Sequence, residues 1–156
     1  MIAKTVTYTD YDGNEVSEKL YFNLNVMELR HIKFDGIPER VSIKNYLEKL
    51  LKEIKELSET DNADEKEAKL DIVYSLVEQL IVKSYGVKTD DGRSFMKSKE
   101  IADNFRNSAA FESIYIDFLT NPSLIPDFVN GILPKNAMDK INSANGSGAV
   151  ILPEVK

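Results

Sequence analysis

The first 22 residues alternate between apolar and polar side chains, and this alternation limits the folds open to the chain. Val6 and Tyr8 alternate with threonines in a first run, and Leu20 and Phe22 share one face of a second run. A period of two among β-branched and aromatic residues is typical of β-strands. The Asp-Gly step at 12–13 suits the tight turn between them. The pattern predicts a β-hairpin, and because two strands alone are marginally stable, it must pack on helices or pair with another chain.

Two long helices are predicted in the middle of the chain, because apolar residues recur there at spacings of three and four. The first begins near Ser42, and its apolar face comprises Ile43, Tyr46, Leu47, Leu50, Leu51, Ile54 and Leu57. A polar loop over 58–64 separates it from the second, which runs over about 64–85. The second has Ala68, Ile72, Val73, Leu76, Val77, Leu80 and Ile81 on its apolar face. Gly86 is a predicted C-terminal stop.

Capping residues predict shorter helices on either side of this pair. Asn25, with Glu28 three residues later, forms a capping-box pattern for a helix over 26–33. Residues 87–94 are predicted to be a loop with a turn at Asp90-Asp91-Gly92. Three further helices are predicted, capped by Ser98, by Asn107 or Ser108, and by Asn121 with Pro122 at the first helical position.

The expected fold class is α+β, mostly α: an N-terminal β-hairpin, a bundle of about five to six helices, and a flexible C-terminal tail. A length of 156 residues suits one domain. We place that domain at 1–134, with the hairpin at 1–24 and the helical bundle at 25–134. The apolar pattern is lost over 135–156, which is rich in Asn, Ser and Gly, so this segment is the predicted flexible tail.

Composition excludes several classes of function. The net charge is −6, and the basic residues are scattered among more numerous acids, which disfavours nucleic acid and membrane surfaces as partners. No apolar run is long enough to span a membrane, and the N-terminus lacks the apolar run of a secretory signal. The absence of cysteine excludes disulfides and thiolate sites and fits a reducing cytoplasm.

The residues that catalysis and cofactor binding require are also missing. His31 is the single histidine, and no nucleophile, phosphate-loop or dinucleotide motif accompanies it. We therefore expect a partly buried or surface histidine, no enzyme activity and no cofactor. The acidic run over 10–15 faintly resembles a calcium loop but lacks its ligand spacing, so a hairpin turn explains it better. Acidic residues over 61–67 suit the N-terminus of a helix.

Protein binding is the function that remains, and four residues are its candidates: Tyr11, Tyr21, Phe95 and Met96. Phe95 and Met96 are apolar residues in a polar neighbourhood. An alternative role for this pair is to cover the ends of helices.

Several segments of the sequence together resemble a known family. Residues 7–13 (TYTDYDG) followed by 18–24 (EKLYFNL) resemble the opening of tail assembly chaperones from siphovirus-type phages and prophages of Gram-positive bacteria. A second set follows in the family's order: KSYGVK at 83–88, DDGRSF at 90–95, KS at 97–98, SAAF at 108–111 and FVNGILP at 128–134. The resemblance covers about 4–24 and 80–134, whereas 32–69 matches weakly.

This resemblance implies a protein that binds the long tape measure protein in the host bacterial cytoplasm, keeps it soluble and helps to recruit tail tube subunits. In many such phages a ribosomal frameshift near the end of the reading frame produces a second form of the chaperone with a C-terminal extension. Two alternatives remain open: a structural tail or connector component of the virion, and a small regulatory protein-binding module. The unpaired edge of the hairpin further predicts a homo-oligomer through strand addition.

Overall fold

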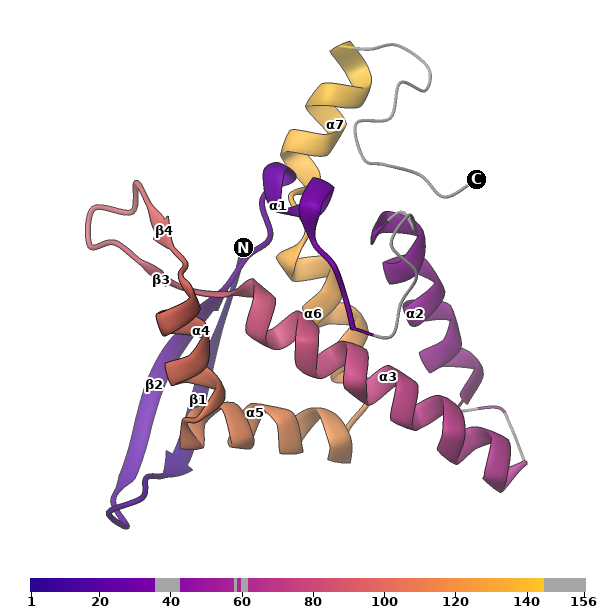
Figure 1. Ribbon diagram of the computed structural model, residues 1–156, viewed down its shortest axis with the longest axis horizontal. Coiled ribbons are helices and arrows are strands. Elements are labelled where there is room, and N and C mark those ends of the chain that lie inside the picture. The colour runs from indigo at the N-terminus through magenta and orange to yellow at the C-terminus, as the bar shows by residue number, and fades with distance from the viewer. Residues whose placement is uncertain (36–42, 58, 60–61, 145–156) are drawn as a thin grey trace. The chain divides into compact units, whose positions relative to one another are not determined.

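The computed structural model describes residues 1–35, 43–57, 59 and 62–144 (Figure 1). Its elements are β1 (Ile2–Thr9), β2 (Glu15–Phe22), α1 (Val26–His31), α2 (Ile43–Leu57), α3 (Ala63–Ser84), β3 (Tyr85–Lys88), β4 (Phe95–Met96), α4 (Lys99–Arg106), α5 (Ala109–Thr120), α6 (Leu124–Ile132) and α7 (Lys135–Ala144). They confirm the expected fold class of an N-terminal antiparallel hairpin followed by helices. The chain divides into two compact units, here called the sheet unit (1–23 and 77–132) and the helical unit (24–76 and 133–156). The expectation of a single domain over 1–134 stays a prediction.

The predicted hairpin is confirmed in the sheet unit. β1 and β2 pair in an antiparallel register that runs from Ile2 opposite Phe22 to Thr9 opposite Glu15. In the turn, Asp10 Oδ1 accepts hydrogen bonds from the backbone N–H groups of Asp12 and Asn14, at 2.9 and 2.8 Å. The turn therefore uses the carboxylate of Asp10 for its own backbone.

Two further strands extend this sheet on either side of the predicted turn at Asp90-Asp91-Gly92, which is present, and of the predicted loop only 87–88 is strand. β3 pairs with β2 through Tyr21 opposite Gly86, and β4 pairs with β3 through Lys88 opposite Phe95. The sheet order is β1-β2-β3-β4. Part of the β2 edge is thus paired, and among the described strands β1 and β4 are the outer ones. The predicted end of the second long helix is confirmed, since α3 ends at Ser84, but Gly86 is part of β3 and does not form a left-handed cap.

A set of polar contacts links the C-terminal end of α3 to Asn23, which follows β2, and to Lys97, which follows β4. The buried Ser84 hydroxyl donates to the carbonyl of Leu80 at 2.6 Å, and the Ser84 carbonyl accepts from the N–H of Asn23 at 2.8 Å. Lys97 Nζ donates to the carbonyls of Asn23 and Lys83, at 2.5 and 3.1 Å. The last carbonyls of a helix lack hydrogen-bond donors within that helix. The Lys97 ammonium supplies a donor at the end of α3, and its positive charge is favourable at the negative end of the helix dipole.

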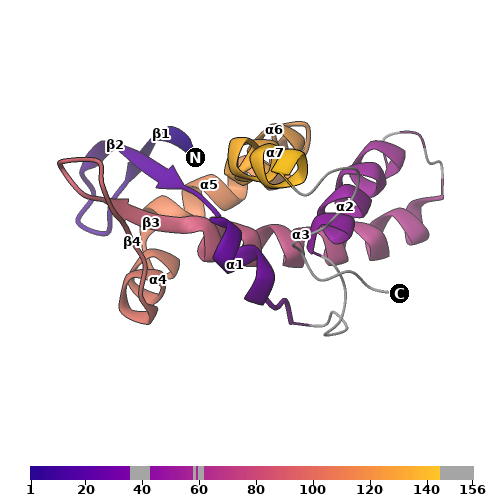
Figure 2. The ribbon, with the colours of Figure 1, turned by 90° about the horizontal axis from the view of Figure 1, so that it is seen from above.

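Phe22 lies at the centre of the core of the sheet unit. Its ring centroid lies 5.8 Å from that of Tyr85, 6.0 Å from Phe105 and 5.3 Å from Phe128. Helices α5 and α6 pack against β1 and α4 packs against β3 (Figure 2), so the aromatic residues of strands and helices meet on one face of the sheet. The other buried apolar residues of this unit are Val6, Leu20, Val77, Leu80, Ile81, Ala110, Ile114, Phe118, Ile125, Val129 and Ile132.

Most predicted helix starts are confirmed, and two details differ. The capping box of Asn25 and Glu28 is present, and Ser98 and Ser108 are N-caps. Pro122 lies in a turn, and α6 begins at Leu124 instead. The segment over 135–144 forms α7, where no helix was expected. The remainder of the predicted flexible tail, 145–156, lies outside the described residues.

The raised pKa of a tyrosine on the hairpin makes the free energy of unfolding vary with pH in the alkaline range. Tyr8 donates a hydrogen bond to Glu18 Oε1 at 2.8 Å, and this bond, with desolvation and the negative charge of Glu18, raises the pKa of Tyr8 to about 12. The unfolded chain loses this proton near pH 10. The stabilising effect is therefore complete below about pH 10 and is lost as the pH rises toward 12. Burial also raises the pKa of Tyr85, which adds in the same direction.

Urea unfolding between about pH 8 and pH 12 tests this coupling. We expect the free energy of unfolding of the wild type to fall more steeply above pH 10 than that of Tyr8→Phe. The variant keeps the ring and Tyr85, so only the coupling to Glu18 is removed. Parallel pH curves for the two proteins would contradict the assignment.

Candidate protein-binding surfaces

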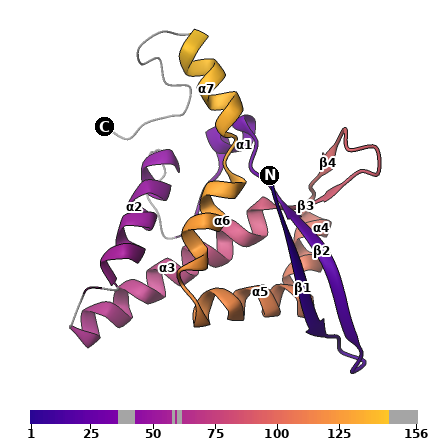
Figure 3. The same cartoon turned by 180° about the vertical axis from the view of Figure 1, so that it is seen from behind.

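One face of the sheet is free of the helices that build the core of its unit. Figure 3 shows the hairpin from this side, with α4 and α5 behind it. Successive side chains of a strand point to opposite faces, so Val6, Leu20 and Phe22 face the core. The opposite face, here called the open face, carries Thr5, Thr7, Thr9, Ser17 and Lys19, all of which are exposed.

Four side chains on the open face form what we call the aromatic–lysine patch: Lys19, Tyr21, Lys88 and Phe95. Lys19 Nζ lies 5.8 Å and Lys88 Nζ 5.4 Å from the centroid of the Tyr21 ring. Each cation–π contact of this kind contributes about 0.5–1 kcal/mol at an exposed site. The ring of Phe95 lies over Gly86, because a Cβ atom there would meet Phe95 Cε2 at 2.6 Å. Glycine thus makes room for the aromatic ring.

The structure places the four predicted binding residues in three locations. Tyr21 and Phe95 share the aromatic–lysine patch, on the strands that flank β3. Met96 is 51% exposed on the opposite face of the sheet, beside its cross-strand partner Val87. Tyr11 is 78% exposed in the turn between β1 and β2. The binding role of all four stays a prediction.

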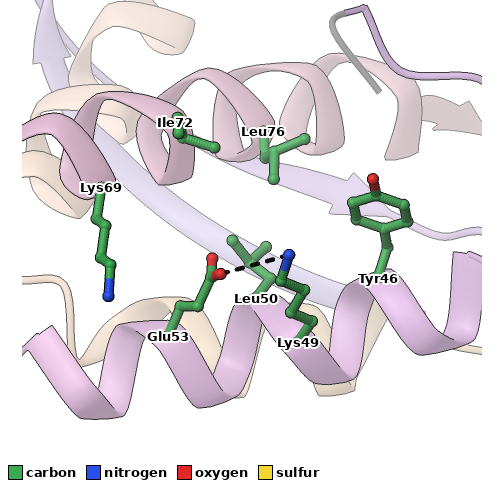
Figure 4. Close-up of a pocket in the computed structure, with 7 residues that line it drawn as sticks. All are labelled: Tyr46, Lys49, Leu50, Glu53, Lys69, Ile72 and Leu76. Carbon is green, nitrogen blue, oxygen red and sulfur yellow. Dashed lines mark ion pairs between the residues drawn. The ribbon is translucent and has the colours of Figure 1, made fainter. Parts of the chain in front are cut away.

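The helical unit contains a pocket between α2 and the part of α3 that belongs to this unit, up to Leu76 (Figure 4). Its volume is about 170 Å³, and its lining comprises Tyr46, Lys49, Leu50, Glu53, Lys69, Ile72 and Leu76. Leu50 and Leu76 are buried, whereas Ile72 is 59% exposed. Lys49 and Glu53 form an ion pair at 3.7 Å. The pocket therefore combines an apolar base with charged groups at its rim.

Comparison with protein families gives a match over nearly the whole chain. A family model described as phage tail assembly chaperone matches residues 1–154. The chain belongs to this family. The match includes 32–69, where the sequence resemblance is weak. No curated protein and no solved structure matches the chain.

Membership in the tail assembly chaperone family implies an assembly role rather than catalysis, in line with the side-chain inventory. His31 is exposed at the end of α1. Within the described residues of this chaperone, no three His, Asp or Glu side chains converge as a metal site would require. None of the described helices has the length and apolar character needed to cross a membrane.

The sequence analysis missed the pocket between α2 and α3 of this chaperone. Ile72 lies in the same apolar stripe as Val73 and Leu76, both of which are buried. A stripe of this kind predicts a buried face, and nothing in its spacing marks Ile72 as exposed. The exposure of Ile72 depends on how α2 and α3 pack against each other, and the spacing of apolar residues along one helix does not encode that packing.

Proposed function

We propose that this chain binds the tape measure protein of a siphovirus-type phage of Gram-positive bacteria. In the host cytoplasm it keeps that protein soluble and helps to recruit tail tube subunits around it. The observation that carries the proposal is the family match over residues 1–154. The tape measure protein is long and helical, so its apolar stripes need a partner until the tail is built.

The pocket between α2 and α3 supports this proposal. Amphipathic helices bind in apolar grooves by inserting anchor side chains spaced along one face. A volume of about 170 Å³ accepts one large apolar side chain, which would contact Leu50, Ile72 and Leu76. Lys49, Glu53 and Lys69 at the rim would then face the polar residues beside that anchor.

Co-expression tests the proposed function directly. We expect a tape measure fragment from the same phage to be insoluble alone, and to be soluble and co-elute with this chain when the two are expressed together. A fragment that stays insoluble, with no complex on a sizing column, would refute the proposal. Detection of this chain in purified virions would instead indicate a structural tail or connector component.

Replacing Ile72 with glutamate tests the role of the pocket. The carboxylate would stand in the apolar wall, so we expect binding of a short tape measure peptide, chosen to be soluble on its own, to weaken at least about tenfold, or about 1.4 kcal/mol. Because the side chain is 59% exposed, the free energy of unfolding should change by only about 0.5 kcal/mol. Isothermal titration calorimetry and urea unfolding measure the two effects.

Ile116→Glu is the matched control, since Ile116 is 47% exposed on α5 in the sheet unit. It introduces the same charge on a helix outside the pocket. Equal loss of binding in both variants would show that added charge, and not the pocket, is responsible.

A further inference from the structure

We infer that the acidic turn of the β1–β2 hairpin docks on the aromatic–lysine patch of a second copy of this chain. The two surfaces are complementary in charge and both present a tyrosine. This contact differs from strand addition at a sheet edge, and it does not depend on binding of the tape measure protein.

The donor surface is the turn over 10–15. Asp10, Asp12 and Glu15 supply three carboxylates within six residues, and Tyr11 in the same turn has a side chain that is 78% exposed. The hydrogen bonds from the N–H groups of Asp12 and Asn14 to Asp10 hold the turn in one conformation. Binding therefore requires little ordering of this segment, which favours association.

The acceptor surface is the aromatic–lysine patch. Two ammonium groups, from Lys19 and Lys88, converge on the single ring of Tyr21 in a chain whose net charge is −6. Lys88 Nζ also donates to the Thr89 carbonyl at 3.5 Å. Among the described residues, neither ammonium forms an ion pair. A carboxylate from another molecule would relieve the repulsion between these two cations.

The donor and acceptor surfaces do not meet within one molecule. Glu15 of the turn lies four positions before Lys19, the nearest lysine of the patch, on β2. A strand rises about 3.3 Å per residue, so their Cα atoms are about 13 Å apart, and Lys19 Nζ lies over the Tyr21 ring, farther from the turn. Since the ladder between β1 and β2 keeps this distance fixed, the turn of one copy can reach only the patch of another.

A turn that meets the patch of another copy is compatible with two kinds of assembly. The contact can be reciprocal in a closed twofold dimer, or it can repeat head-to-tail in a ring or open chain. A single turn on a single patch buries little area, so we expect weak binding, with a dissociation constant of about 0.1 mM.

Charge reversal on each side separately provides the test. The turn variant is Asp12→Lys with Glu15→Lys, which keeps Asp10 in its structural role, and the patch variant is Lys19→Glu with Lys88→Glu. Sedimentation velocity of the full chain is followed from about 10 µM to about 1 mM. We expect the wild type to associate as concentration rises, and each variant alone to stay monomeric. An equimolar mixture should associate again, because each turn then meets a patch of opposite charge.

Two controls complete the design. Lys135→Glu with Lys140→Glu makes the same change in net charge as the patch variant, at exposed positions on α7, and should associate like the wild type. Circular dichroism and thermal unfolding confirm that each variant folds. Raising the salt from about 0.05 M to about 0.5 M should weaken association of the wild type.

Three outcomes would overturn the inference. A wild type that stays monomeric over the whole range excludes the contact. Association of the single variants at wild-type strength indicates another interface, such as strand addition on β1. Monomeric variants that fail to associate when mixed show that the patch does not receive the turn of a second copy.

Discussion

Replacing Phe22 with alanine is expected to lower the free energy of unfolding by about 3–5 kcal/mol. Phe22 has no exposed surface, and its ring contacts Tyr85 on β3, Phe105 on α4 and Phe128 on α6. Truncation removes the buried apolar surface, the edge-to-face contacts and the support that this ring gives to both helices. The surrounding aromatic rings are large and rigid, so they cannot collapse into the space left behind.

Urea and thermal unfolding measure this loss, which for a chain of this size corresponds to a fall in melting temperature of roughly 6–20 °C. Tyr21→Ala is the matched control. It removes a neighbouring aromatic ring from the same strand, but on the open face, where the ring contacts Lys19 and Lys88. Its cost should stay below about 2 kcal/mol. Equal losses in the two variants would mean that Phe22 does not organise the core.

The contrast between Phe22 and Tyr21 was predictable, because strand alternation is a local property of the sequence. A period of two placed Leu20 and Phe22 on the buried face without any knowledge of the helices. Helix starts at Asn25, Ser98 and Ser108 were predictable for a similar reason. Each depends on a side chain and a backbone N–H group two or three residues away.

The strands β3 and β4 were not predictable, because their pairing is not local. Tyr85 directly follows a helix of 22 residues, and β4 has two residues, so neither segment shows a strand period of its own. Their strand geometry depends on the pairing of Tyr21 and Phe22 with Gly86 and Tyr85, more than 60 positions along the chain. The same pairing brings Phe95 to the face that carries Tyr21. Sequence therefore identified both aromatic residues but not the patch that they share.

The second large effect is expected at Gly86, where alanine should lower the free energy of unfolding by about 1–3 kcal/mol. A Cβ atom at this position would lie 2.6 Å from Phe95 Cε2, 2.8 Å from Phe95 Cζ and 2.9 Å from the carbonyl oxygen of Met96. The ring can rotate away, but the carbonyl belongs to the backbone of β4. The added methyl group therefore displaces both the Phe95 ring and the strand that carries it.

A double-mutant cycle separates these two causes by urea unfolding. If the clash with the ring dominates, Gly86→Ala should cost less stability in a Phe95→Ala background than in the wild type. The difference between those two costs is the coupling energy, and for residues in contact it is typically about 0.5–3 kcal/mol. A purely additive cycle would assign the whole cost to the Met96 carbonyl. A stable Gly86→Ala protein with no loss at all would show that Phe95 does not lie over Gly86. In that case Phe95 would not pack closely on the sheet at Gly86, and the aromatic–lysine patch would lose the contact that gives it its shape.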